Sequence, residues 1–243
     1  MQATQPPSGD YGRGRGSYPE PTIISTENLS RSFGWGDGAV TAVNDVDLAV
    51  STGEFLSLVG RSGSGKTTLL NLMAGLDQPT SGKVWFQGKH LGSFSESEMV
   101  QLRRRNIGFI FQSFGLIPLL SANENVELPL HISGVSWRER RRRAAEVLEL
   151  VGLSSRADHR PYELSGGEQQ RVAIARALAS NPDVVFADEP TGELDTATGI
   201  SIANILRDVA RDQGVTVIVA THDLTLSGMS DRVLQMVDGA VLN

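Results

Sequence analysis

The feature that most constrains the fold is a short apolar segment that runs directly into a glycine-rich loop and then into a helix-favouring segment. Residues 55–59 precede Gly60-Arg61-Ser62-Gly63-Ser64-Gly65-Lys66-Thr67-Thr68, and residues 69–74 have helical character. The pattern G-x-x-x-x-G-K-S/T between a strand and a helix is typical of a phosphate-binding loop. Glycines let backbone N–H groups curl around phosphates, the lysine reaches the β- and γ-phosphate oxygens, and the hydroxyl after it can coordinate Mg²⁺. The candidate phosphate-binding residues are Gly60, Ser62, Gly63, Ser64, Gly65, Lys66, Thr67 and Thr68.

A second stretch, Leu164-Ser165-Gly166-Gly167-Glu168-Gln169-Gln170-Arg171, places two glycines ahead of the good helix formers of residues 168–178. The first N–H groups of a helix have no intrahelical partner and attract anions. Ser165 and Glu168 also fit the S-x-x-E capping box, so a capped helix start alone would explain the pattern. Its position between two other polar motifs favours an anion contact at Ser165, Gly166 and Gly167.

Polar residues follow three further apolar segments at the point where each ends. Gln112 follows residues 107–111, Asp188 and Glu189 follow residues 184–187, and His222 follows residues 215–220. In open α/β sheets, ligands bind at the carboxyl ends of the strands, where Gly60 is also expected. A lone glutamine or histidine is usually structural, but four strands delivering polar residues to one edge indicate a site. We expect Asp188 to hold Mg²⁺ and Glu189 to polarise a water for attack.

The remaining segments predict supporting structure. Residues 22–50 alternate as an antiparallel, half-buried sheet, to which residues 81–88 add a strand. Phe33, beside flexible glycines, could stack on a base or be an ordinary core or strand-edge aromatic. Trp35 is the alternative candidate for the base contact. We expect helices at residues 91–105, 136–151 and 197–212, and a hairpin at residues 233–241 turning at Asp238-Gly239.

Two other stretches allow two interpretations each. Residues 116–130 combine apolar side chains with two prolines in a loop-like setting, which indicates either a docking surface or burial within a lobe. Arg140 to Arg143 form a basic run in the predicted helix of residues 136–151. We expect it to be a solvated face, and an anionic partner near a membrane is the alternative.

Composition sets limits on the class of protein. The chain has 243 residues, of which 40% are hydrophobic, so a single globular unit with a sizeable core is expected. The net charge of −6 disfavours nucleic acid as a partner, and the absence of cysteine excludes a disulfide framework. The apolar runs are far shorter than the roughly 18 residues of a membrane span. Residues 1–21 lack an apolar core and are expected to be a disordered tail, so a cytosolic protein is predicted.

From Phe33 to His222 these motifs, in this order, resemble those of the ATP-binding-cassette (ABC) ATPases. Residues 60–67 resemble the Walker A motif, Gln112 the Q-loop, residues 164–169 the signature motif, residues 184–189 the Walker B motif with its catalytic glutamate, residues 192–195 the D-loop and His222 the switch histidine. The signature motif is the most specific of them, because other P-loop proteins lack it.

The resemblance implies a P-loop NTPase fold over residues 22–243, with a mostly parallel core sheet, an N-terminal antiparallel β subdomain and an α-helical signature subdomain near residues 113–180. It also implies that two copies pack head to tail on ATP, so that Ser165, Gly166 and Gly167 act on the nucleotide of the second copy. ATP and Mg²⁺ are the expected cofactors. The resemblance implies that Glu189 is the base and that His222 and Lys66 contact the γ-phosphate. It also implies that Thr67, Gln112 and Asp188 form the metal site, that Gln112 in addition reports the nucleotide state to a lobe, and that Phe33 contacts adenine.

Residues 111–118 and 124–130 resemble the subgroup that serves lipoprotein release and macrolide or peptide export (LolD/MacB-like). The resemblance implies an ATPase subunit at the inner face of the cell membrane, which drives a separate permease docked near Ser113–Leu130. A soluble ATPase acting on DNA or ribosomes is the alternative, and a nucleotide-binding module without turnover is a third. Glu193 departs from the family pattern, because many relatives have asparagine there in the D-loop.

Overall fold

The computed structural model describes residues 21–34 and 36–242, and the first of its two sheets is the predicted antiparallel one. The sheet contains β1 (Thr22–Phe33), β2 (Val40–Ser51), β4 (Ser81–Phe86) and the short β5 (Lys89–His90), in the order β2-β1-β4-β5. A short 3₁₀ turn, Gly36–Gly38, lies between β1 and β2. All neighbouring strands run antiparallel, as predicted for this part of the chain.

The second sheet is mostly parallel and has the order β10-β9-β3-β8-β7-β6. Its strands are β3 (Phe55–Val59), β6 (Ile107–Ile110), β7 (Val184–Asp188), β8 (Thr216–Thr221), β9 (Arg232–Val237) and β10 (Ala240–Leu242). Only β10 pairs antiparallel, as the second strand of the predicted hairpin. Because β3, β6, β7 and β8 are parallel neighbours, their carboxyl ends meet at one edge. The predicted α/β fold with a mostly parallel core sheet is confirmed.

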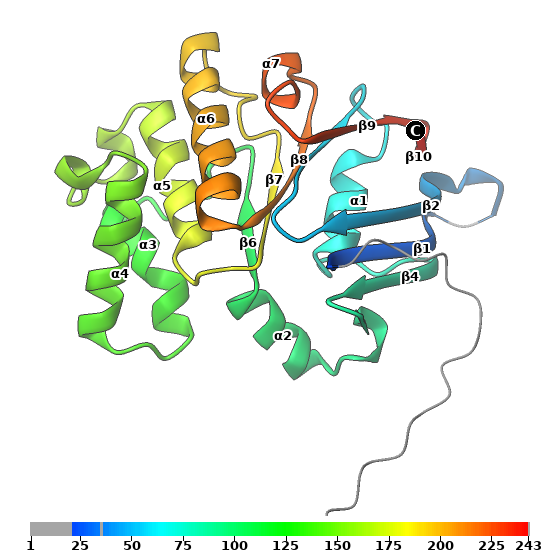
Figure 1. Cartoon of the computed structure of the whole chain (residues 1–243), viewed down its shortest axis with the longest axis horizontal. Coiled ribbons are helices and arrows are strands. Elements are labelled where there is room, and N and C mark those ends of the chain that lie inside the picture. The colour runs from blue at the N-terminus through cyan, green and yellow to red at the C-terminus, as the bar shows by residue number, and fades with distance from the viewer. Residues whose placement is uncertain (1–20, 35, 243) are drawn as a thin grey trace, which may run out of the picture.

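Helices cover both faces of this sheet (Figure 1). On one face, α1 (Lys66–Met73) lies between the two sheets, and its Leu69 and Leu70 share a buried cluster with Ile24 of β1 and Leu58 of β3. On the other face lie α5 (Gly166–Leu178) and α6 (Thr196–Gln213). The sheet therefore separates two hydrophobic cores, which explains why its central strands β3, β7 and β8 are buried on both faces.

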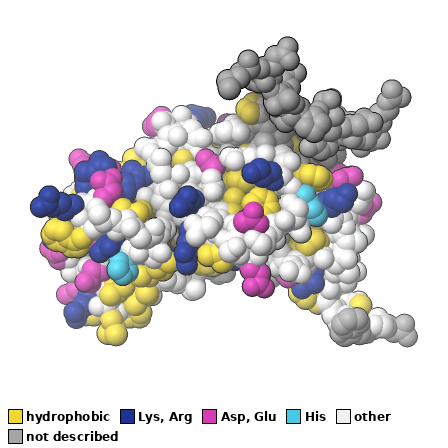
Figure 2. Space-filling model, turned by 90° about the horizontal axis from the view of Figure 1, so that it is seen from below, with side chains coloured by type: hydrophobic (Ala, Val, Ile, Leu, Met, Phe, Trp, Pro, Cys, Tyr) yellow, Lys and Arg dark blue, Asp and Glu magenta, His cyan; other side chains and the backbone are white. Residues whose placement is uncertain are grey.

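A group of three helices lies beside the sheet (Figure 1). It consists of α3 (Ala122–Ile132), α4 (Trp137–Leu150) and α5, which pack on one another through Val126, Leu148 and Val172. The remaining helices are α2 (Glu96–Arg105), α7 (Leu224–Ser227) and the 3₁₀ turns Leu91–Ser93, Ser154–Arg156 and Pro161–Glu163. The face seen from below carries several apolar patches separated by basic and acidic side chains (Figure 2). Within the described part of the chain, no helix is long and apolar enough to cross a membrane.

The loop-like character expected for residues 116–130 is wrong from residue 122 onward, where α3 begins. Ser121 and Glu124 form a complete capping box, and the buried Val126 and Leu130 face the neighbouring helices. Pro129 lies inside the helix, where a proline costs about 3 kcal/mol. The capped start and the apolar face outweigh that cost. Only residues 111–121 remain extended or turn-like, held by the fully buried Asn125, whose side-chain amide donates to the carbonyl oxygens of residues 117, 120 and 121.

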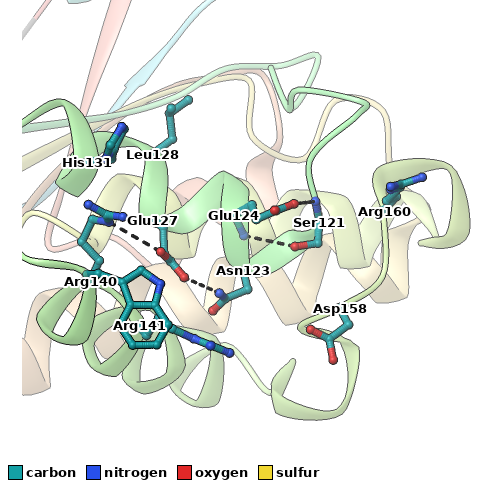
Figure 3. A pocket seen from close by; sticks show the side chains of 11 residues that line it. Ser121, Asn123, Glu124, Glu127, Leu128, His131, Arg140, Arg141, Asp158 and Arg160 are labelled. Atoms are coloured by element: carbon teal, nitrogen blue, oxygen red, sulfur yellow. Dashed lines mark hydrogen bonds and ion pairs between the residues drawn. The ribbon is translucent and has the colours of Figure 1, made fainter.

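The predicted solvated face of Arg140 to Arg143 is correct for half of the run. Arg141 lies over the exposed ring of Trp137, and the exposed Arg142 pairs with the carboxylates of residues 139 and 146. Arg143 instead donates to the carbonyl oxygens at the end of α5, and the half-buried Arg140 pairs with Glu127 at 3.6 Å. Figure 3 shows Arg140, Arg141 and Glu127 at the wall of a cavity between α3 and α4. The run therefore binds the helical group together as well as facing solvent.

Candidate active site

The glycine-rich loop connects β3 to α1 and presents a bare helix start. Gly65 caps α1 with φ of 102°, and a Cβ there would lie 2.0 Å from the carbonyl oxygen of Ala42. Gly63 also has positive φ, at 79°, so the loop needs glycine at both positions to curl. No side chain caps the helix, and its first N–H groups are left to bind an anion. This is the geometry expected of a phosphate cradle.

Lys66 lies almost wholly buried at the base of the cradle. Its Nζ donates to the carbonyl oxygens of Gly60 at 2.9 Å and Arg61 at 3.3 Å, and lies 3.6 Å from Glu189 Oε1. The two carbonyl oxygens hold the Lys66 ammonium group in the loop, where it lies next to the Glu189 carboxylate. A buried lysine and a buried glutamate are each costly alone, and their pairing offsets part of that cost.

Glu189 lies at the centre of the polar cluster. Its Oε2 is 2.9 Å from His222 Nδ1 and accepts a hydrogen bond from the backbone N–H of His222 at 3.3 Å. The histidine ring is 70% exposed, whereas the Glu189 side chain is only 16% exposed. The structure thus brings together three of the predicted catalytic residues, Lys66, Glu189 and His222, which come from α1 and from the ends of β7 and β8.

Asp188 and Thr67 are adjacent, as the predicted metal site requires. The Thr67 hydroxyl donates to Asp188 Oδ1 at 3.0 Å. Burial raises the pKa of Asp188 above its usual value and the negative charge of Glu189 adds to this effect, whereas the hydrogen bond from Thr67 and the charge of Lys66 oppose it. A cation beside this carboxylate would stabilise its ionised form.

Gln112, which follows β6, reaches the same place. A Cβ at position 192 would lie 3.4 Å from Gln112 Nε2 and 3.5 Å from Glu189 Cβ. The Gln112 side-chain amide therefore lies beside the turn that contains Glu189 and Gly192. Most of the residues predicted from the glycine-rich loop and the strand ends line one cavity of about 710 Å³: Ser62, Gly63, Ser64, Gly65, Lys66, Thr67, Thr68, Gln112, Glu189 and His222. Asp188 does not line it and is connected to it through the hydrogen bond from Thr67. Gly60 lies at its base as an acceptor for Lys66.

Two residues of this cavity were not singled out from the sequence, Ala42 and Arg61. Arg61 stands inside the loop motif at a position that the pattern leaves free, so its place within the motif is the only sequence signal for it. Ala42 belongs to β2 in the other sheet and touches the loop only because the two sheets pack across α1. No local signal in the sequence indicates that contact.

Phe33 lies apart from this cavity. Phe33 is 45% exposed at the end of β1, and the Arg31 guanidinium lies 4.5 Å from its ring centroid. Phe33 is not among the residues that line the phosphate cavity. Trp35, the alternative base-stacking residue, lies outside the described residues, so an adenine contact by either residue stays a prediction.

The predicted anion contacts at the start of α5 also lie elsewhere. Ser165 caps α5 through a complete capping box with Glu168, so the predicted helix start is confirmed. Ser165, Gly166 and Gly167 line a separate cavity of about 550 Å³ together with Glu193, Asp195 and residues 152–156 in part. None of the residues of the phosphate cavity lines this second cavity. Within one chain, the two helix starts do not form a single site.

Comparison with known proteins identifies the family. A family model described as ABC transporter matches residues 43–192. YbbA of Escherichia coli (strain K12), described as an ABC transporter ATP-binding protein, is 49% identical over 221 residues, which cover 91% of this chain and 97% of YbbA. The macrolide export ATP-binding/permease protein MacB 2 of Yersinia pestis is 44% identical over 220 residues, but these cover only 32% of its length.

The same relationship holds for solved structures. The ATP-binding cassette MJ0796 of Methanocaldococcus jannaschii, in a dimeric post-hydrolysis state bound to ADP and Pi, superposes with a TM-score of 0.83 at 43% identity. The match covers 91% of this chain and 97% of that one. With the phosphate loop, the glutamate beside His222 and the capped glycine pair in place, the chain belongs to the ABC transporter family and is one of its ATP-binding ATPases.

Proposed function

We propose that two copies of this chain close head to tail on ATP, and that each composite site joins the phosphate loop of one copy to Ser165, Gly166 and Gly167 of the other. The observation that carries this proposal is the separation of the two helix starts into different cavities of one chain. Each presents free N–H groups to an anion, yet neither can reach the other's ligand. A second copy supplies the missing half, and the dimeric state of MJ0796 with ADP and Pi supports this arrangement.

The chemistry proposed for each site follows the positions of the polar groups. ATP phosphates lie on the loop of residues 60–68, where Lys66 offsets the charge of the β- and γ-phosphates. The oxygen of a water attacks the γ-phosphorus, the bond to the β–γ bridging oxygen breaks, and the water proton passes to Glu189. ADP and phosphate result. His222 would contact the γ-phosphate, and its exposed ring and its hydrogen bond to Glu189 support this role.

Mg²⁺ fits the oxygen ligands offered at the start of α1 and at the carboxyl ends of β6 and β7. Thr67, Asp188 and Gln112 would hold it together with phosphate oxygens, and when bound it neutralises charge on the β- and γ-phosphates. The raised pKa of Asp188 supports this assignment, because a cation would favour the ionised carboxylate. Within the described residues, no cluster of three or more His, Cys, Asp or Glu side chains could hold a metal alone.

The replacement Asp188→Asn is expected to stabilise the nucleotide-free protein at pH 8. A carboxyl whose pKa is raised on folding contributes stability that is full below its unfolded-state pKa and lost as the pH rises through the folded-state pKa. Asparagine keeps an acceptor for Thr67 without the charge. Thermal unfolding should show a higher melting temperature at pH 8 and no gain near pH 4, whereas Mg²⁺-dependent ATP hydrolysis should fall at least about 100-fold.

Asp208→Asn is the matched control, because Asp208 is exposed on α6 and, among the described residues, forms an ion pair only with its neighbour Arg207. It should change neither the melting temperature at pH 8 nor the rate of hydrolysis. A lower melting temperature for Asp188→Asn at pH 8 would contradict the burial argument, and unchanged hydrolysis would contradict the metal site.

The replacement Ser165→Arg tests the composite site. A long cation at the start of α5 should block contact with the second copy's nucleotide, so ATP-driven dimerisation and hydrolysis should fall at least about 100-fold. Nucleotide affinity of the monomer should stay within about twofold, since its own phosphate cavity is untouched. Ser154→Arg makes the same change at an exposed residue outside the second cavity and should leave hydrolysis intact. Loss of ATP binding by the monomeric Ser165→Arg protein would overturn the proposal.

We also propose that the chain lies at the inner face of the cell membrane, where it drives an integral permease. The surface proposed for docking is Ser113–Leu130, in which Ile117 and Leu119 are exposed, Leu119 by 80%. Beside it, a mainly apolar cavity of about 390 Å³ lies between α2, β6, α3 and α5, lined by Val100, Phe109, Pro129 and Ile132 among others. MacB, whose name joins an ATP-binding part to a permease, supports this type of partner. Arg176 ties this surface to α5, because its Nη2 donates to the carbonyl oxygen of Phe114 at 3.0 Å.

Leu119→Asp should weaken the association with the permease, because it places a charge in an exposed apolar surface. Affinity purification of the tagged protein from solubilised membranes should recover the integral membrane protein with the wild type and at least about tenfold less of it with Leu119→Asp. ATP-driven dimerisation should not change. Leu242→Asp, at an exposed position of β10, is the control. Equal recovery with Leu119→Asp and the wild type would exclude this surface.

A further inference from the structure

Gln170 lies in the middle of α5 and is completely buried. Its Nε2 donates a hydrogen bond of 2.7 Å to the carbonyl oxygen of Pro190, twenty residues away in the chain. Pro190 directly follows Glu189, the residue placed between Lys66 and His222. A side chain of the helix that begins at Ser165 therefore contacts the backbone that carries the glutamate of the same chain.

The glutamate lies in a constrained turn. Glu189 has φ of 46°, in the left-handed region that favours glycine, and the Gly192 N–H donates to the Glu189 carbonyl oxygen at 3.0 Å. Its own N–H donates to Ala220 of β8 at 2.8 Å. Pro190 is the second residue of this turn, so the direction of its carbonyl group is tied to the orientation of the whole turn. The donor that fixes this direction is Gln170.

The oxygen of the Gln170 amide indicates which property of glutamine this position requires. Gln170 Oε1 is buried and has no hydrogen-bond partner within the described part of the chain. An unpaired buried amide oxygen costs free energy. A methionine of similar size would avoid that cost while filling the same space, but it could not donate to Pro190. The requirement at this position is therefore the hydrogen bond.

We propose that Gln170 is a positioning residue that couples the two ATP sites of the dimer through one chain. The inference rests on the proposed function, in which Ser165, Gly166 and Gly167 contact the nucleotide of the second copy. Gln170 follows these residues by one turn of α5, and it holds the turn from which Glu189 of its own chain reaches its own nucleotide. Closure of α5 on one ATP thereby sets the catalytic geometry at the other.

Heterodimers of two differently tagged copies test this directly. One copy carries Glu189→Gln, so that only the intact Glu189 of the other copy supports turnover. Gln170→Met is then placed in either copy. We expect a roughly tenfold lower kcat when it lies in the copy with the intact Glu189, and less than about a twofold change when it lies in the Glu189→Gln copy. The ATP concentration that half-saturates the enzyme should not change with either placement.

The placement separates the alternatives. Equal falls in kcat for both placements would indicate general destabilisation, and a fall only in the Glu189→Gln copy would show that Gln170 acts through the start of α5 on the partner's site; either result overturns the inference. Gln170→Glu keeps the volume but replaces the donor by an acceptor, and it should show the same dependence on placement if Gln170→Met folds poorly. Gln213→Met, at the exposed end of α6, is the control for the substitution itself.

Failure of the proposed function would give a different result. In that case Glu189→Gln homodimers would hydrolyse ATP at the wild-type rate, or ATP would not induce a dimer at all. The proposed function stands and only the Gln170 inference fails if ATP induces the Glu189→Gln homodimer, this homodimer does not hydrolyse ATP, and kcat is the same for both placements of Gln170→Met.

Discussion

The parallel pairing of β3, β8, β7 and β6 is the constraint on which the rest of the molecule depends. Neighbouring parallel strands end at the same edge, so the phosphate loop, Gln112, Asp188 and His222 meet there although up to 162 residues separate Gly60 from His222. β3, β7 and β8 are buried on both faces, and β6 at the edge is fully buried on one face. Apolar packing fixes the register of these strands. The packing of the strands therefore brings the polar residues that follow them to a common site, and these residues need not be close in sequence.

A second constraint comes from the helix starts of α1 and α5. Both offer backbone N–H groups to an anion, and both are built around glycine. Placed in different cavities of one chain, they can act on the same nucleotide only in an assembly of two copies. The Gln170 contact to Pro190 then gives α5 a role in both sites, because one end of the helix faces the partner and its middle holds the turn of Glu189. Binding and catalysis at the two sites are linked by this rigid element.

Local patterns in the sequence predicted most of the fold and most of the site. The strand, loop and helix of residues 55–73, the capping box at Ser165 and the apolar strand of residues 184–187 are each encoded by neighbouring residues, so their prediction succeeded. The helix at residues 122–132 was missed because Pro118 and Pro129 favour a loop, whereas the capping box of Ser121 and the burial of Val126 favour a helix. Ala42 at the phosphate cavity and Gln170 beneath Pro190 depend on packing between distant segments. No spacing rule within one segment contains such contacts.

The most direct test of the composite site is a cross-link between the two helix starts. The chain contains no cysteine, so Ser62→Cys on one tagged copy and Ser165→Cys on another, both with Glu189→Gln, introduce a single reactive pair across the dimer. With a short thiol-specific cross-linker, the account predicts a covalent dimer of the two tagged copies that forms with ATP and not without it. Absence of that product, in a protein that binds ATP, would contradict the central claim.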